Sequence, residues 1–138
     1  DVYKRQGYAS PIHTTKEATD NDFNQGLEYA FKNLETISIF CGTHNEESVR
    51  LLIQLMNDNR IQNNDSRITF SQLLGMSDNI SFVLGKLGFN VAKYIPYGPV
   101  REVMPYLIRR AQENTAVKGQ SGRELTLISK ELKRRKSA

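Results

Sequence analysis

Two adjacent arginines in the segment YLIRRAQEN, residues 106–114, are the side chains best suited to bind a small anion. Arg109 and Arg110 follow Tyr106 and precede Glu113, with three residues from Tyr106 to Arg109 and from Arg110 to Glu113. A guanidinium group stays charged at any working pH, and its planar donors match the two oxygens of a carboxylate. The cluster therefore indicates either a pocket for a small carboxylate or a solvated helix face.

Alternating strands and helices would have to position these side chains. Segments rich in β-branched and aromatic residues predict three strands, at residues 36–41, 67–74 and 89–95. Apolar residues at helical spacing predict helices at residues 18–35, 46–58 and 78–88, with two more beginning at Pro99 and Ser121. Strand–helix units repeated at intervals of about 25 to 30 residues predict a parallel α/β architecture with right-handed crossovers.

The predicted helix ends carry plausible capping residues. Thr19 or Asp20 could cap the first helix, and Thr43, with Glu46 three residues later, could cap the second. Pro99 could occupy the first position of the helix that contains the arginine pair, where its missing N–H costs nothing.

Several polar and aromatic residues follow the predicted strands directly. Thr43 and His44 follow the first strand, Leu73 closes the second, and Tyr94 lies at the end of the third. Because ligands of parallel α/β folds bind at the carboxyl ends of the strands, these residues and the arginines are expected at one edge. This convergence favours a functional site over a set of unrelated surface residues.

Composition excludes several classes of protein. The 138 residues suffice for one domain, and the single Cys41 excludes an internal disulfide and is typical of a reducing cytosol. No apolar run approaches the roughly 20 residues that span a bilayer. The net charge of +4 is concentrated in residues 101–138, which hold 10 Lys and Arg against 4 Asp and Glu. This basic segment lacks interleaved aromatics and nucleic-acid motifs, so we expect a solvated helix end and no nucleic-acid partner.

The segment YIPYGPVREVMPYLIRRAQEN, residues 94–114, resembles the last strand and following helix of proline dehydrogenases. TKEATD and FCGTHN, residues 15–20 and 40–45, resemble earlier segments of that family in the same order. The pattern Tyr-x11-Tyr-x2-Arg-Arg-x2-Glu-Asn is specific, whereas THN alone would be weak. The resemblance runs over residues 7–138, and residues 1–6 do not fit the family pattern and are expected to be a leader or an artefact.

The resemblance implies a fold and a substrate site. The fold would be a distorted (β/α)8 TIM-like barrel carrying FAD, of which this chain holds only the C-terminal β/α units. Arg109 and Arg110 would hold the carboxylate of proline, and Tyr94, Tyr106 and Leu73 would line the pocket for its ring. The alternative for Leu73 is a core residue near the mouth of the barrel.

Further roles are implied by the same resemblance. Glu113 would orient one of the arginines. Thr43 and His44 would contact the pyrophosphate or adenosine of FAD, and Thr14 and Lys16 would approach its adenosine end. The catalytic lysine and aspartate of the family would lie upstream of this chain, and no metal is expected.

The implied function is FAD-dependent oxidation of L-proline to 1-pyrroline-5-carboxylate, with electrons passed to a quinone. This chain would be an inactive fragment of that oxidoreductase, located in the cytoplasm with an optional peripheral contact to the inner membrane. Two alternatives stay open: a non-enzymatic α/β module that binds small anions, and a nucleic-acid binder that uses the basic C-terminus. The sequence leaves open a preference between proline and hydroxyproline and a fusion to a pyrroline-carboxylate dehydrogenase.

Overall fold

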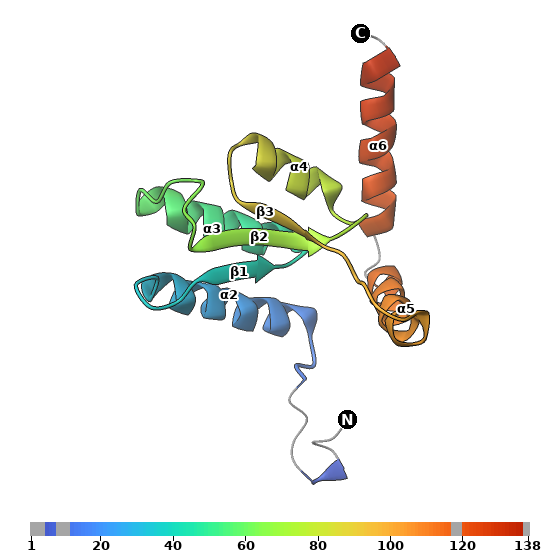
Figure 1. Cartoon of the computed structure of the whole chain (residues 1–138), viewed down its shortest axis with the longest axis horizontal. Helices are drawn as coiled ribbons and strands as arrows, with labels where there is room; N and C mark the ends of the chain where they lie inside the picture. Colours follow the sequence, from blue (N-terminus) through green and yellow to red (C-terminus); the bar gives the residue numbers. More distant parts are fainter. Residues whose placement is uncertain (1–4, 8–11, 117–119, 137–138) are drawn as a thin grey trace.

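The computed structural model describes the backbone of residues 5–7, 12–116 and 120–136 (Figure 1). In the last two helices it describes the side chains of residues 100–110, 125–127, 129–130 and 132–136. The elements follow one another as α2 (Lys16–Lys32), β1 (Ile39–Gly42), α3 (Glu46–Asp58), β2 (Ile68–Leu73), α4 (Asp78–Lys86), β3 (Val91–Tyr94), α5 (Val100–Ala116) and α6 (Gln120–Lys136). This order confirms the predicted alternation of strands and helices.

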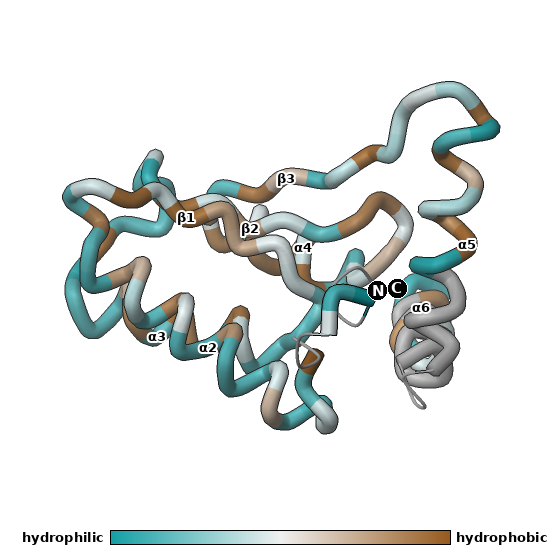
Figure 2. The backbone as a smooth tube through the Cα atoms, turned by 90° about the horizontal axis from the view of Figure 1, so that it is seen from below, coloured by the Kyte–Doolittle hydropathy of each residue, from teal (hydrophilic) through white to brown (hydrophobic). Residues whose placement is uncertain are grey.

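The three strands form one parallel sheet in the order β1-β2-β3. Cys41 pairs with Phe70, and Leu73 pairs with Tyr94, so all three strands end at the same edge. Helices α2, α3 and α4 lie on one face of this sheet, and α5 lies beyond the carboxyl ends of the strands (Figures 1 and 2). The arginine-bearing helix therefore stands next to the edge at which the sequence predicted a site.

The hydrophobic core lies between the sheet and the helices that cover it. Leu52, Met56 and Phe70 are completely buried, and Phe70 meets Phe89 edge to face with ring centroids 5.4 Å apart. The opposite face of the sheet is not covered by the described residues: Phe40 is 67% exposed and Tyr94 is 53% exposed. Successive side chains of a strand point to opposite faces of the sheet. Because Leu73 pairs with Tyr94, its side chain lies on this exposed face as well.

Two predicted helix caps are wrong. The first helix begins at Lys16, because the extended Thr15 accepts a hydrogen bond from the amide of Ala18, so Thr19 and Asp20 lie inside the helix. At α3 the cap is Asn45, whose side chain accepts from the amide of Glu47. Asparagine is as good a cap as threonine and stands directly before the first helical residue, which explains the choice.

Other helix ends differ slightly from prediction. Thr43, expected to cap α3, accepts a hydrogen bond from the Asn45 amide and so shapes the loop instead. Pro99 precedes α5 rather than opening it, and its carbonyl accepts from the amides of Glu102 and Val103. The predicted strands are two or three residues longer than the observed ones, and β1 ends at Gly42, one residue past its predicted end.

An ion pair fixes the turn that leads into β2. Asp65 accepts hydrogen bonds from the backbone amide, Nε and Nη2 of Arg67, at 3.0, 2.9 and 2.7 Å. These bonds lower the pKa of Asp65 from 3.8 to about 2. Because the folded-state pKa is the lower one, this contribution to stability is present above pH 4 and is lost as the pH falls toward 2.

Candidate functional site

Three of the predicted substrate-binding residues form a continuous row at the carboxyl edge of the sheet. The rings of Tyr94, at the end of β3, and Tyr106, on α5, meet edge to face with centroids 6.2 Å apart. The guanidinium carbon of Arg110 lies 5.3 Å from the centroid of the Tyr106 ring. Stacking on an aromatic face attracts the cation and restricts the side chain, so Arg110 is directed by Tyr106. This row presents aromatic surface next to a fixed positive charge.

The other two predicted substrate residues differ in how they join this row. Leu73 is half-buried and pairs with Tyr94 across the sheet, which places it beside the row on the face that the helices leave uncovered. Arg109 is exposed on α5, one residue before Arg110. Consecutive helical residues diverge by about 100°, so both guanidinium groups can converge on one ligand only by bending their stems. The structure thus brings Leu73 and Arg110 to the site more closely than Arg109.

Thr43 and His44 lie half-buried in the loop between β1 and α3. The Nδ1 atom of His44 lies 2.8 Å from the hydroxyl of Ser77, a contact that sets the orientation of the imidazole. The Thr43 hydroxyl accepts from the Asn45 amide, which leaves its own proton to be donated to an acceptor. Both residues therefore offer polar groups to a ligand at the edge.

The start of α3, which follows Thr43 and His44, is poorly suited to bind a phosphate. Asn45 already caps it, and Glu46 and Glu47 place two carboxylates in its first turn. Arg50 pairs with both, at 3.6 Å and 2.6 Å, and offsets part of their charge. A dinucleotide contact here would fall on Thr43 and His44 rather than on the helix terminus.

The remaining predicted residues contribute less to the described geometry. Thr14 and Lys16 are exposed at the end of α2 that faces the carboxyl edge of the sheet (Figure 1). Lys16 forms an ion pair with Asp20, so its ammonium is engaged within its own helix. The side chain of Glu113 lies outside the described residues; its backbone belongs to α5.

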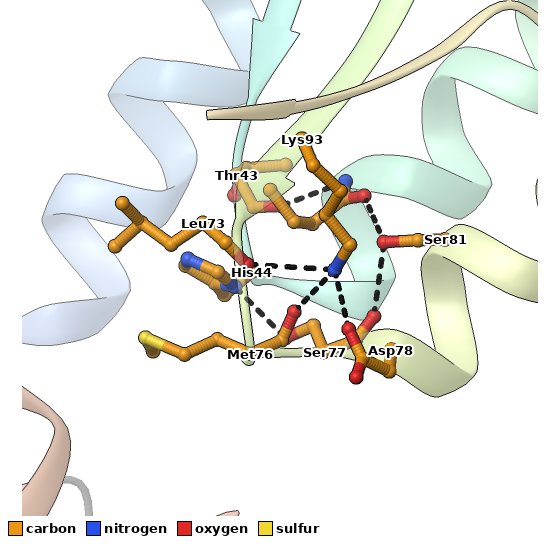
Figure 3. A network of polar contacts seen from close by, with 9 residues as sticks. Thr43, His44, Leu73, Met76, Ser77, Asp78, Ser81 and Lys93 are labelled. Carbon is orange, nitrogen blue, oxygen red and sulfur yellow. Dashed lines mark hydrogen bonds and ion pairs between the residues drawn. The ribbon is translucent and has the colours of Figure 1, made fainter. Parts of the chain in front are cut away.

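A polar network between the end of β3 and the loop that joins β2 to α4 was not predicted from the sequence (Figure 3). Lys93 extends from β3 toward the loop before α4, where its ammonium lies 2.7 Å from Asp78 and donates to the carbonyls of Met76 and Leu73. A lysine inside an otherwise apolar strand is a signal that could have revealed it.

A second branch of the network joins the loop after β1 to α4 (Figure 3). The buried Gln72 donates to the carbonyl of Thr43 at 3.3 Å and accepts from the hydroxyl of Ser81 at 2.8 Å. Because buried amides must be paired, Gln72 holds the Thr43 loop against the helix layer.

Some chemical groups are not found in the described part of the chain. Among the side chains that the structure describes in residues 5–7, 12–116 and 120–136, no cluster of His, Cys, Asp or Glu could hold a metal. In the same ranges, no helix is long and apolar enough to cross a membrane. Burial raises the pKa of Cys41 from 9.0 to about 11, so its thiol stays protonated and unreactive.

Comparison with known protein families shows to which family this chain belongs. The family model described as proline dehydrogenase matches residues 2–123. The chain belongs to the proline dehydrogenase family. The match includes β1 to β3 and all of α5, and therefore every residue of the Tyr94–Tyr106–Arg110 row.

Individual relatives agree with this membership. The chain is 45% identical to bovine proline dehydrogenase 1, mitochondrial, over 132 residues, and 43% identical to the human protein of that name; each match covers 94% of this chain. It is also 42% identical to bovine hydroxyproline dehydrogenase over 139 residues, covering 98% of the chain and 30% of that protein. The chain spans 22% of the length of the two proline dehydrogenases.

A solved structure confirms the predicted fold. The crystal structure of proline utilization A from Bdellovibrio bacteriovorus, inactivated by N-propargylglycine, superposes with a TM-score of 0.75 at 24% identity. The alignment covers 85% of this chain and 12% of that one. The parallel β/α units of the proline dehydrogenase segment are thus part of a TIM-like barrel.

The expected cytoplasmic localisation is wrong. The bovine, human and Drosophila melanogaster proline dehydrogenases that match the chain are all named mitochondrial. A single cysteine cannot separate these compartments, because it reports only that no internal disulfide forms.

Proposed function

We propose that residues 7–138 form the C-terminal part of the catalytic barrel of a mitochondrial, FAD-dependent proline dehydrogenase. The complete enzyme oxidises L-proline to 1-pyrroline-5-carboxylate and passes the electrons to a quinone. The observation that carries this proposal is the Tyr94–Tyr106–Arg110 row at the carboxyl edge, within a segment that matches the proline dehydrogenase family.

Substrate binding follows from the chemistry of the row. The charged, bidentate guanidinium of Arg110 is suited to the carboxylate of proline, and Arg109 can add a second contact by bending toward it. Tyr94, Tyr106 and Leu73 offer an apolar and aromatic surface to the five-membered ring, and closing that surface around the ring excludes water. These residues bind and orient the substrate.

The residues at the neighbouring loop fit FAD in part. Thr43 has a hydroxyl proton to donate, and His44 is held in place by Ser77, so both can contact the dinucleotide. The carboxylates of Glu46 and Glu47 oppose a phosphate on the start of α3. When bound, FAD would supply the hydride acceptor. The residues of this chain would hold the substrate and the dinucleotide in position for that step.

The proposal is tested on the complete enzyme, defined here as the full-length chain that contains residues 7–138. The purified enzyme should carry bound flavin and reduce a quinone only when proline is supplied. Parallel titrations with proline and hydroxyproline assign its preference, since relatives of both names match the chain. An enzyme that binds small carboxylates but carries no flavin would favour the non-enzymatic anion-binding module instead.

Replacing Glu113 by alanine in the complete enzyme should weaken proline binding, although the glutamate need not touch the substrate. Glu113 stands three residues after Arg110 and four after Arg109, within reach of either guanidinium on one helix. In a closed pocket, loss of the partner would cost roughly 3–5 kcal/mol, against about 0.3–0.5 kcal/mol on an exposed helix.

A double-mutant cycle with each arginine distinguishes these cases. A coupling free energy near zero for both pairs would leave Glu113 as an ordinary surface residue. Glu102→Ala, in the exposed first turn of the same helix, is the matched control.

A further inference from the structure

Lys93 occupies an unusual place for a charged residue. It lies in β3 between Ala92 and Tyr94, and it is paired across the sheet with the buried Gln72. Its side chain is only 21% exposed, and it reaches the loop between β2 and α4 on the helix-covered face. Because successive side chains of a strand point to opposite faces, Lys93 lies across the sheet from Leu73 and Tyr94, which line the proposed substrate site.

The ammonium of Lys93 is fully coordinated. It lies 2.7 Å from Asp78 Oδ1, 2.7 Å from the carbonyl oxygen of Met76 and 3.4 Å from that of Leu73 (Figure 3). An ammonium has three N–H donors, so these partners account for all of them. Asp78 is half exposed, so the ion pair alone contributes little; the two carbonyl contacts fix the loop.

The loop that Lys93 contacts contains two residues in the left-handed backbone conformation. Gly75 has a φ of 77° and Ser77 a φ of 49°, both in the left-handed region. For Ser77 this conformation is costly and persists only where surrounding contacts impose it. The Met76 carbonyl, which accepts from Lys93, belongs to the peptide that joins Met76 to Ser77.

The same loop connects the two halves of the site. At its start, Leu73 lies beside Tyr94, and the amide of Leu74 donates to the Tyr94 carbonyl at 3.0 Å. At its end, the Ser77 hydroxyl contacts Nδ1 of His44 at 2.8 Å. A shift of the loop would therefore displace a substrate-lining residue and the orientation of His44 together.

We propose that Lys93 is a positioning residue that couples the substrate pocket to the cofactor contact through the loop of residues 74–77. This inference rests on the proposed function and deepens it, because it names a residue that touches neither substrate nor cofactor. A purely structural role would instead lower thermal stability alone.

The test uses Lys93→Met in the complete enzyme, which keeps the length of the side chain and removes its donors. We expect the KM for proline to rise about tenfold and FAD to be retained less tightly, with kcat at saturating FAD changed by less than about twofold. Lys93→Arg keeps donors for the carbonyls, so its KM for proline and its FAD retention should lie between those of the wild type and those of Lys93→Met. Lys86→Met, on the exposed side of α4, is the control and should change neither.

Ser77→Ala separates the two arms of the loop. It removes the contact with His44 but leaves Lys93 and Leu73 in place, so it should weaken FAD retention without raising the KM for proline. A Lys93→Met enzyme with unchanged KM and unchanged FAD retention, or with only one of them altered, would overturn the coupling. If Lys93→Met fails to fold, the same comparison is made with Lys93→Gln, which keeps one donor group.

The inference and the proposed function fail in different ways. A wild-type complete enzyme that does not oxidise proline would contradict the proposed function and this inference with it. An active wild type whose Lys93 variants lose only thermal stability would overturn the inference and leave the proposed function standing.

Discussion

Replacing Arg110 by lysine in the complete enzyme is expected to raise the KM for proline by about 10- to 100-fold while FAD stays bound. Lysine keeps the charge but loses the planar pair of donors that matches a carboxylate. It also loses the flat surface that stacks on Tyr106, where the guanidinium carbon lies 5.3 Å from the ring centroid. Two of the features that direct the charge are therefore removed by one substitution.

Arg109→Lys should show the same direction with a smaller effect, because Arg109 is exposed whereas Arg110 is half-buried against Tyr106. Arg101→Lys, in the exposed first turn of α5, is the matched control and should leave the KM unchanged. Steady-state kinetics with flavin content measured on each variant separates substrate binding from cofactor loss. Unchanged proline affinity in both the Arg109 and the Arg110 variants would contradict the assignment of the arginine pair.

Residues 1–138 expressed alone are expected to bind no flavin and to show no proline-dependent dye reduction. A (β/α)8 barrel typically needs about 250 residues and closes only when all eight strands are present. The described part of this chain supplies a sheet of β1, β2 and β3, whose outer strands each have one neighbour. Unpaired strand edges favour aggregation, so poor solubility is expected as well.

The uncovered face of the sheet leads to the same expectation. Phe40 and Tyr94 are mostly exposed there, so an apolar surface that a barrel would enclose faces solvent. Flavin absorbance and proline:quinone activity of the purified fragment check the prediction, with the complete enzyme as the positive control. A soluble, yellow and active product of residues 1–138 would show that these residues do not depend on the rest of a barrel.

The arrangement of the fold could be predicted because its signals are local. Apolar spacing fixed α3 at residues 46–58, and the β-branched segments located all three strands. Leu73 and Tyr94 lie at the same edge because β2 and β3 are parallel, and the alternation of strands and helices already implied parallel pairing. Helix caps were less certain, because Thr15 and Asn45 competed with other capping residues nearby.

The site could be predicted only in part, because its finer geometry depends on contacts between distant residues. The motif around Arg110 predicted a carboxylate site, but its stacking on Tyr106 and the meeting of Tyr106 with Tyr94 depend on how α5 packs. The contacts of Lys93 were not predicted: a lysine in an apolar strand signals a buried polar partner, but the residue types do not show that the partners include the carbonyls of Met76 and Leu73.

The most direct test of the central claim compares L-proline with pyrrolidine, the same ring without its carboxylate, as substrates of the complete enzyme. If the Tyr94–Tyr106–Arg110 row binds the carboxylate, wild-type kcat/KM should favour proline by about 100-fold or more. In Arg110→Met this preference should collapse, mainly through loss of activity toward proline. A preference for proline that is the same in the wild type and in Arg110→Met would contradict the account.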